Sequence, residues 1–290
     1  MSIPHLPKRA KFLVSGVALA AIFGVAATVP TQGSTAVEPP RTAVASTSSK
    51  PTVVLVHGAW ADPSSFAPVT KELQSDGFTV LNAPNPLRGL DQDSANVAAF
   101  VNQATTGPVV LVGHSYGGSV ITNAATTTPR VKALVYVDAY APAEGESVID
   151  LTGAKPGSAF AGDPTKVFNF VQYPPGPTTP KDDVDAYVKP ELFGDIFAAE
   201  LPTSETKVLA ASQTPIALSA LQAPSKAPAW KTIKSFFFIG TGDKVLPAAQ
   251  QVAMAKRADG VIVMRKADHL SMLETPQQIT KLIERAARTD

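Results

Sequence analysis

The stretch "VVLVGHSYGGSV", residues 109–120, places a serine between glycines directly after an apolar run. The uninterrupted apolar residues 109–112 predict a strand buried on both faces, as in a parallel sheet. Residues 119–125 predict the start of a helix, which Pro129 ends. The connection reads G-x-S-x-G, and its glycines relieve the crowding of a strained strand-to-helix turn. We therefore interpret Ser115 as a candidate nucleophile at a helix N-terminus, against the alternative of an incidental serine in a glycine-rich loop.

Composition limits the classes of protein to consider. The chain has 290 residues, 44% of them hydrophobic and 17% charged, which is typical of a globular protein with a large core. A net charge of +1 gives no basic footprint for nucleic acid. The chain has no cysteine, so disulfides cannot stabilise it. No cluster has metal-ligand spacing and no G-x-G-x-x-G follows the first strand, so we expect neither a metal nor a cofactor.

The first residues have the pattern of an export signal. Three basic residues precede residues 12–27, an apolar run without charge, and small residues follow. We predict a signal peptide over residues 1–36, with cleavage after Ala27 or Ala36, and a flexible Ser/Thr/Pro/Ala linker over residues 37–51. An uncleaved anchor is the alternative, although the run is shorter than the about 20 residues of a membrane helix. The predicted location is secreted or extracytoplasmic, without stable membrane insertion after cleavage; the sequence does not indicate an oligomeric state.

Strand and helix patterns alternate over residues 52–140 and again over residues 231–290. This alternation predicts an α/β fold, with a mostly parallel central sheet flanked by helices. The strands are expected at 52–56, 78–84, 109–112, 131–140, 235–240 and 261–265, and the helices at 66–76, 93–103 (with Asp91 or Asp93 near the N-cap), 119–125, 247–258 and 276–287.

The alternation stops over residues 141–230. This segment contains a proline-rich run, residues 173–180, and three short helical patterns, at 181–187, 191–199 and 204–211. Because it lies between two predicted core strands, we interpret it as an inserted, mainly helical cap. Such a cap would cover the carboxyl edge of the sheet, where open α/β folds bind ligands. A surface elaboration without function is the alternative.

A serine nucleophile needs a base in contact with its hydroxyl. The chain has four histidines, and elimination leaves one of them. His5 lies in the signal, His57 belongs to the first turn, and His114 precedes the nucleophile, so that its side chain should point away. His269 follows a predicted strand on a loop at the sheet edge, and we predict that it is the base.

The acid partner must hold the histidine in the correct tautomer. Asp243 directly follows a predicted buried strand, and the chain order Ser115, Asp243, His269 matches that of nucleophile-elbow hydrolases. Asp138 ends another strand and is a competitor, whereas Asp268 is too close to the histidine in sequence to reach its ring. We prefer Asp243.

The oxyanion hole needs two backbone N–H groups directed at the developing charge. We expect one from Tyr116, the residue after the nucleophile, and one from Ala59, in the turn after the first strand. Gly58 allows this turn to approach closely. We expect Trp60, Phe66, Tyr140 and Leu270 to line the pocket.

Four motifs together carry a family resemblance: "LVHGAW", "LVGHSYGG", "GTGDK" and "ADHLSMLETPQ". They resemble the α/β-hydrolase superfamily, and more narrowly the plant-type carboxylesterase and hydroxynitrile lyase group with its bacterial esterase relatives. The resemblance covers roughly residues 52–286. It implies a serine carboxylesterase with the triad Ser115, Asp243 and His269, no cofactor and no metal. The motifs are weakly specific for substrate, and our leading hypothesis is an exported hydrolase of small to medium apolar carboxylic esters.

Two alternatives belong to other functional classes. The hydroxynitrile lyases use a lysine beside the catalytic histidine, where this chain has Leu270, and favour a hydroxyl-bearing residue where it has Ala59. Both departures favour ester hydrolysis over a carbon–carbon lyase. A non-catalytic ligand-binding protein on the same scaffold is the second alternative. A serine nucleophile also disfavours dehalogenase and epoxide hydrolase activity, since the resembling members of those families use aspartate.

Overall fold

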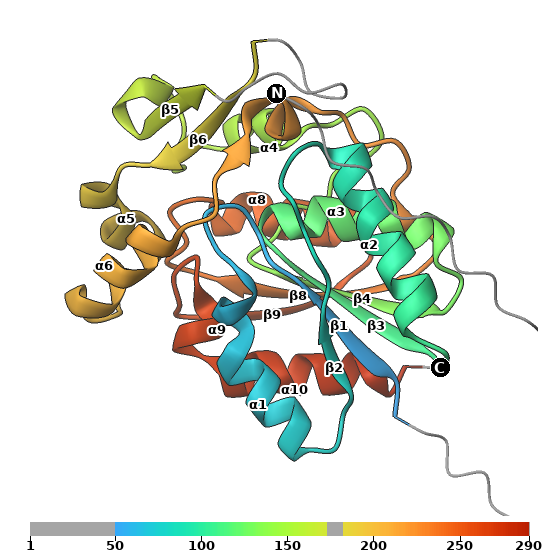
Figure 1. The fold of residues 1–290 in the computed structure, drawn as a ribbon. Helices are drawn as coiled ribbons and strands as arrows, with labels where there is room; N and C mark the ends of the chain where they lie inside the picture. Colours follow the sequence, from blue (N-terminus) through green and yellow to red (C-terminus); the bar gives the residue numbers. More distant parts are fainter. Residues whose placement is uncertain (1–49, 173–181, 290) are drawn as a thin grey trace, which may run out of the picture. The chain divides into compact units, whose positions relative to one another are not determined.

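The computed structural model describes residues 50–172 and 182–289, which belong to one compact unit. Its centre is a six-stranded sheet in the order β2-β1-β3-β4-β8-β9, with every pairing parallel (Figure 1). The prediction of a mostly parallel sheet is confirmed. The strands are β1 (Thr52–Val56), β2 (Val80–Asn82), β3 (Val109–His114), β4 (Val131–Val137), β8 (Lys234–Gly240) and β9 (Val261–Arg265).

The central strands are apolar because helices cover both of their faces. Every residue of β3 is buried, and Val112 pairs with Leu55 of β1 on one side and with Val135 of β4 on the other. A strand buried on both faces needs no alternation of polar and apolar residues, which explains the uninterrupted runs in the sequence. Since all six strands run in the same direction, the loops that follow them lie together along the carboxyl edge of the sheet.

Helices lie on both faces of this sheet (Figure 1). Helices α1 (Ala67–Ser75) and α10 (Pro276–Ala287) pack together on one face, and α2 (Leu90–Ala104), α3 (Tyr116–Ala124) and α8 (Ala248–Arg257) lie on the other. Helix α10 has the predicted bounds. It buries the expected apolar face through Ile279, Leu282, Ile283 and Ala286, because these positions fall on one side of a helix.

Helix α2 begins three residues earlier than expected. Its N-cap residue is Gly89, which has no side chain to cap the helix. Asp93, in the first turn, takes over that role: its carboxylate accepts the backbone N–H groups of Arg88 and Gly89. The Gly89 N–H is one of the donors that a helix N-terminus leaves without an intrahelical partner, and the Arg88 N–H directly precedes it.

The segment between β4 and β8 folds into short helices and a separate three-stranded antiparallel sheet, β5-β6-β7. The helical predictions at 191–199 and 204–211 are confirmed, but the one at 181–187 is wrong. Residues Val184–Val188 form a strand, with Val184, Ala186 and Val188 on one face and Asp185 and Tyr187 on the other, and valine and tyrosine suit a half-buried sheet. The elements are α4 (Val148–Gly153), β5 (Phe168–Gln172), β6 (Val184–Val188), α5 (Pro190–Phe197), α6 (Thr203–Ser212), β7 (Ile216–Ala217) and α7 (Leu218–Gln222).

Three of the expectations fall outside the described residues: the signal peptide, nearly all of the linker, and the proline-rich run at 173–180. Within residues 50–172 and 182–289, no helix combines the length and the apolar character needed to cross a membrane.

Candidate active site

The candidate residues meet at the carboxyl edge of the parallel sheet. Ser115 directly follows β3, Asp243 lies three residues after β8, and His269 lies four residues after β9. Ala59 and Trp60 belong to the turn after β1. Because the strands are parallel neighbours, segments far apart in the sequence converge at one place.

The turn at Ser115 has an unusual backbone conformation. Ser115 has φ 52° and ψ −124°, outside the regions that non-glycine residues ordinarily occupy. The flanking glycines allow close approach: a Cβ on Gly113 would lie 2.6 Å from the Gly117 carbonyl oxygen, and a Cβ on Gly117 would lie 2.5 Å from that of Val56. The turn therefore places the serine hydroxyl at the start of α3, and any larger residue at these two glycines would displace the backbone.

Replacing Gly117 with alanine should destabilise the protein by about 1–3 kcal/mol or more, because its new methyl group would meet rigid backbone of β1. The matched control is Gly107→Ala, since a Cβ at Gly107 meets no atom within 4 Å. Guanidinium unfolding of both variants gives the comparison. Equal stability of the two variants would contradict the crowding argument.

His269 connects the candidate nucleophile Ser115 to the candidate acid Asp243. Its Nε2 lies 2.9 Å from Ser115 Oγ, and its Nδ1 lies 2.9 Å from Asp243 Oδ2. All three side chains are buried. A carboxylate only accepts, so the proton belongs on Nδ1, and Nε2 accepts the serine hydroxyl. This is the tautomer that a general base requires.

Among the described residues, every hydrogen-bond partner of the Asp243 carboxylate is a donor. Oδ1 accepts the backbone N–H groups of Val245 and Leu246 at 2.8 and 2.9 Å, and Oδ2 accepts the amide of Gln251 at 2.8 Å as well as the His269 ring. Burial raises the pKa of the Asp243 carboxyl, and these donated bonds oppose that rise. A protonated carboxyl would need a hydrogen-bond acceptor for its own O–H. All four groups donate instead, so this environment favours the ionised carboxylate. The sequence analysis did not identify Gln251. This residue lies in α8, and no motif around it indicates a contact with Asp243.

Asp138, the competing candidate for the acid, is committed elsewhere. It directly follows β4 and is fully buried, and it accepts the backbone N–H of Gly240 at 2.6 Å and the hydroxyl of Ser271. It therefore ties the end of β8 to the loop that carries His269. Asp268 likewise faces away from the ring and accepts the backbone N–H of Glu200.

The other two described histidines lie behind the site. His114 Nε2 donates to the backbone carbonyl of His269 at 2.9 Å, so its ring supports the loop rather than the nucleophile. His57 Nδ1 is bonded to the carbonyl of Gly58, directly after β1. Burial lowers the pKa of all three imidazoles, and that of His269 falls to about 3. A neutral ring is the form that can accept a proton.

The two expected oxyanion donors flank Ser115 at the cavity wall. Ala59 and Tyr116 line the same cavity as the serine. Within the described part of the chain, neither of their backbone N–H groups has a hydrogen-bond acceptor. The Tyr116 hydroxyl points away from the cavity, to Asp93 at 2.8 Å. Two unpaired donors beside a nucleophile can bind a developing negative charge.

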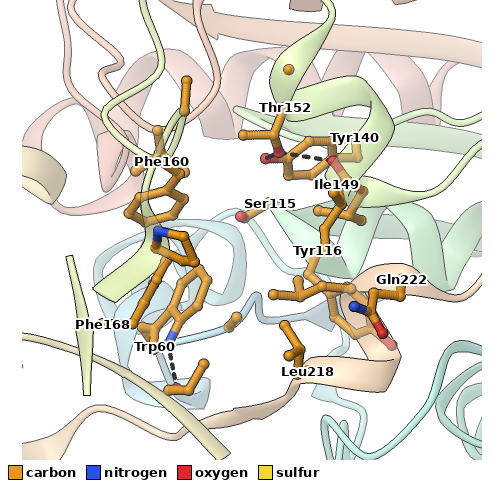
Figure 2. A pocket seen from close by; sticks show the side chains of 18 of the residues that line it. Trp60, Ser115, Tyr116, Tyr140, Ile149, Thr152, Phe160, Phe168, Leu218 and Gln222 are labelled. Atoms are coloured by element: carbon orange, nitrogen blue, oxygen red, sulfur yellow. Dashed lines mark hydrogen bonds between the residues drawn. The ribbon is translucent and has the colours of Figure 1, made fainter. Parts of the chain in front are cut away.

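Ser115 faces a cavity of about 560 Å³ (Figure 2). Trp60, Phe160 and Phe168 form an aromatic wall on one side, and aliphatic and hydroxyl side chains of the insertion lie opposite. No charged side chain is present among the described residues that line it. These are Ala59, Trp60, Ser115, Tyr116, Tyr140, Val148, Ile149, Thr152, Gly153, Phe160, Ala161, Gly162, Pro164, Phe168, Phe170, Ala186, Leu218, Leu221, Gln222 and Val245.

The four expected pocket residues separate into two pairs. Trp60 and Tyr140 line the cavity. Phe66 does not line it: this side chain is fully buried and its ring packs edge-on against His114, beneath the site. Leu270 is also buried outside the cavity wall, and its backbone N–H donates to the carbonyl of Phe197. The orientations of these two side chains cannot be read from the sequence, because each depends on how its loop packs.

The insertion supplies contacts that the sequence analysis did not assign. Phe160, Phe168 and Phe170 come from one stretch of it, and the F-x-F spacing in β5 was the available signal. Phe197, at the end of α5, packs edge-on against the His269 ring at 5.3 Å.

No group of metal-binding side chains occurs within residues 50–172 and 182–289.

Three features together indicate the class of protein: the parallel sheet, the strained serine turn and the buried histidine–aspartate pair. Residues 53–282 match the model of the alpha/beta hydrolase family, and the chain belongs to this family. The expected fold class is thus confirmed.

The chain is also similar to individual proteins and solved structures. The chain is 34% identical over 110 residues to the carbendazim hydrolyzing esterase of Nocardioides sp., a match that covers 34% of this chain and 46% of that one. The chain thus spans about half the length of this relative. Solved structures of polyneuridine aldehyde esterase and of a methylesterase from Arabidopsis each match at 18% identity, covering 81% of this chain and 98% of theirs, with TM-scores of 0.68 and 0.64.

Proposed function

We propose that this protein is a serine carboxylesterase that cleaves small to medium apolar carboxylic esters. One observation carries the proposal: the hydrogen-bonded chain Ser115–His269–Asp243 faces an uncharged cavity. A buried polar network with only a structural role requires neither an adjoining cavity nor a strained turn, and the strain costs free energy.

The geometry supports a two-step acyl transfer. Ser115 Oγ attacks the ester carbonyl while His269 Nε2 takes its proton, and Asp243 stabilises the imidazolium that forms. The backbone N–H groups of Ala59 and Tyr116 bind the oxyanion of the tetrahedral intermediate. His269 then gives the proton to the leaving alcohol. Water, activated by the same imidazole, hydrolyses the acyl-enzyme and releases the acid.

The cavity chemistry restricts the substrate. Its volume of about 560 Å³ is within the range of drug-sized ligands, roughly 300–1,000 Å³. With no charged side chain among the described lining residues, a charged substrate would lose hydration without a partner. Uncharged esters with apolar arms therefore fit best. The position beside His269 holds the uncharged Leu270, and the oxyanion turn holds Ala59 rather than a residue with a hydroxyl; these two residues disfavour the lyase alternative.

A labelling and turnover experiment tests the proposal. A fluorophosphonate probe should modify the protein at Ser115, and p-nitrophenyl esters of rising acyl length should show a rate maximum that reports the cavity size. Mandelonitrile should not be cleaved above its spontaneous rate. Enzyme-dependent cyanide release without ester turnover would support the lyase instead, and neither labelling nor turnover would support the ligand-binding protein.

The acid limb of the pH profile should lie lower than that of an ordinary histidine. Protonated His269 cannot take the proton of Ser115, so activity falls below its pKa. Because burial lowers this pKa to about 3 from 6.5, we expect kcat/KM to keep its plateau below pH 6.5. Circular dichroism at each pH separates this effect from acid unfolding. A midpoint at or above 6.5 would show that the ring is more readily charged than its burial implies.

We also propose that the protein is exported, on the basis of the sequence pattern over residues 1–36. N-terminal sequencing of protein from the culture medium should then begin between Ala26 and Pro40. Recovery of the full-length chain from the cytoplasm alone would contradict export. Full-length protein in the membrane fraction would indicate a retained anchor.

A further inference from the structure

Trp60 directly follows the oxyanion residue Ala59, and its backbone is strained. Its φ is 57°, in the left-handed region, where a bulky side chain is rare and costs about 1–3 kcal/mol. Such a conformation persists only where the surroundings hold it in place. The contacts of Trp60 show what holds it.

Two hydrogen bonds tie Trp60 to the inserted segment. Its backbone N–H donates to the carbonyl of Thr214 at 2.8 Å. Its indole Nε1–H donates to the carbonyl of Ala186 in β6, also at 2.8 Å (Figure 2). Thr214 lies two residues before β7, which pairs with β6. One acceptor therefore lies in a strand of the small antiparallel sheet, and the other lies in the chain that leads into the neighbouring strand.

Aromatic contacts from the same segment fix the indole ring. Phe168 of β5 stacks on Trp60 at 5.2 Å, while Phe160 and Phe197 meet it edge-on at 5.1 and 6.0 Å. The residue is 4% exposed. The inserted segment thus holds both the backbone and the ring of the residue next to the oxyanion donor.

We propose that Trp60 is a positioning residue, through which the inserted segment holds the Ala59 N–H in line with the oxyanion. This proposal rests on the proposed function and extends it: the insertion contributes to the rate of the chemical step as well as to substrate binding. Hydrogen-bond donors for an oxyanion act only over a narrow range of positions, and losing one costs about 10²–10³ in kcat. Releasing the indole bond should misplace this donor without removing it.

The test compares the two tryptophans of the chain. Trp60→Phe removes the indole bond to Ala186 but keeps an aromatic ring. Trp230→Phe is the matched control, because Trp230 is also buried and donates its indole N–H to a backbone carbonyl, that of Pro142, at 2.9 Å. We expect Trp60→Phe to lower kcat for p-nitrophenyl acetate about tenfold with little change in KM, since oxyanion stabilisation is specific to the transition state. Trp230→Phe should lose similar stability and keep its kcat.

A boronic acid inhibitor gives a second measurement, since its adduct with Ser115 places an oxygen where the oxyanion forms. Its inhibition constant should rise in Trp60→Phe by the factor that kcat/KM falls. If Trp60→Phe does not fold, benzothienylalanine at position 60 removes only the N–H donor, and circular dichroism checks the fold.

Three outcomes would overturn the proposal. In the first, the wild type turns over esters and the position-60 variant keeps kcat within twofold. In the second, that variant changes only KM. In the third, Trp230→Phe loses as much kcat. Each of these leaves the esterase function standing, whereas a wild type without labelling or turnover refutes both proposals.

Discussion

Replacing Ser115 with alanine is expected to lower kcat for ester hydrolysis by about 10⁶-fold, by comparison with other serine triads. The change removes the only atom among residues 50–172 and 182–289 that bonds His269 Nε2, and it keeps the backbone of the turn. The oxyanion donors remain, so a small rate above that in water should persist. Turnover of a p-nitrophenyl ester and loss of fluorophosphonate labelling are the measurements.

Ser119 provides the matched control for this experiment. It lies in the same helix α3, is fully buried, and its hydroxyl has no partner among the described residues. Ser119→Ala should therefore keep both labelling and kcat, because no bond is lost. If Ser115→Ala retained kcat within tenfold of the wild type, the nucleophile would be a different group.

Asp243→Asn is expected to lower kcat by about 10³–10⁴-fold while the fold is retained. Asp243 Oδ1 accepts two backbone N–H groups, so the amide oxygen of asparagine must take that position. The amide NH₂ then faces His269 Nδ1, which has to become an acceptor. The ring proton moves to Nε2, and the base can no longer accept the hydroxyl proton of Ser115. The rate loss and the unchanged circular dichroism spectrum together test this tautomer argument.

Asp138→Asn is the comparison, because it changes a second buried carboxylate at the same sheet edge. Here the amide oxygen can keep the N–H of Gly240, and the NH₂ faces the hydroxyl of Ser271, which can reverse its role and accept. We expect its loss in kcat to be at least tenfold smaller than that of Asp243→Asn, because Asp138 makes no hydrogen bond to the His269 ring among the described residues. The opposite order of losses would make Asp138 the acid.

The residues nearest the reacting atoms are the most predictable from sequence, because each follows a strand with a strong apolar pattern. Ser115, Asp243 and His269 come after such strands, and parallel pairing alone brings these strand ends together. Elimination among four histidines then completes the choice of base. None of these steps needs knowledge of side-chain packing.

Packing decides what the sequence could not predict. Phe66 and Leu270 are close to the site in sequence, but they turn beneath it, toward His114 and Phe197. Residues 181–187 read as a helix because their composition is ambiguous. Most of these residues form β6 instead, because they pair with β5 on one side and with β7 on the other. Of the aromatic wall, Phe168 belongs to this small sheet, whose pairing joins segments that are far apart in the sequence.

The hydrogen bonds of Trp60 bear on protein engineering. Both acceptors on the inserted segment are backbone carbonyls, so they depend on the path of that segment and not on its side chains. The cavity-facing side chains of residues 141–230, other than the Phe160 and Phe168 rings that pack on the indole, can therefore be randomised to alter substrate preference, provided that the strand pairing around Ala186 is preserved. Library designs that shorten or re-register this sheet should yield well-folded proteins with poor turnover, whereas designs that keep it should yield active enzymes with new selectivity.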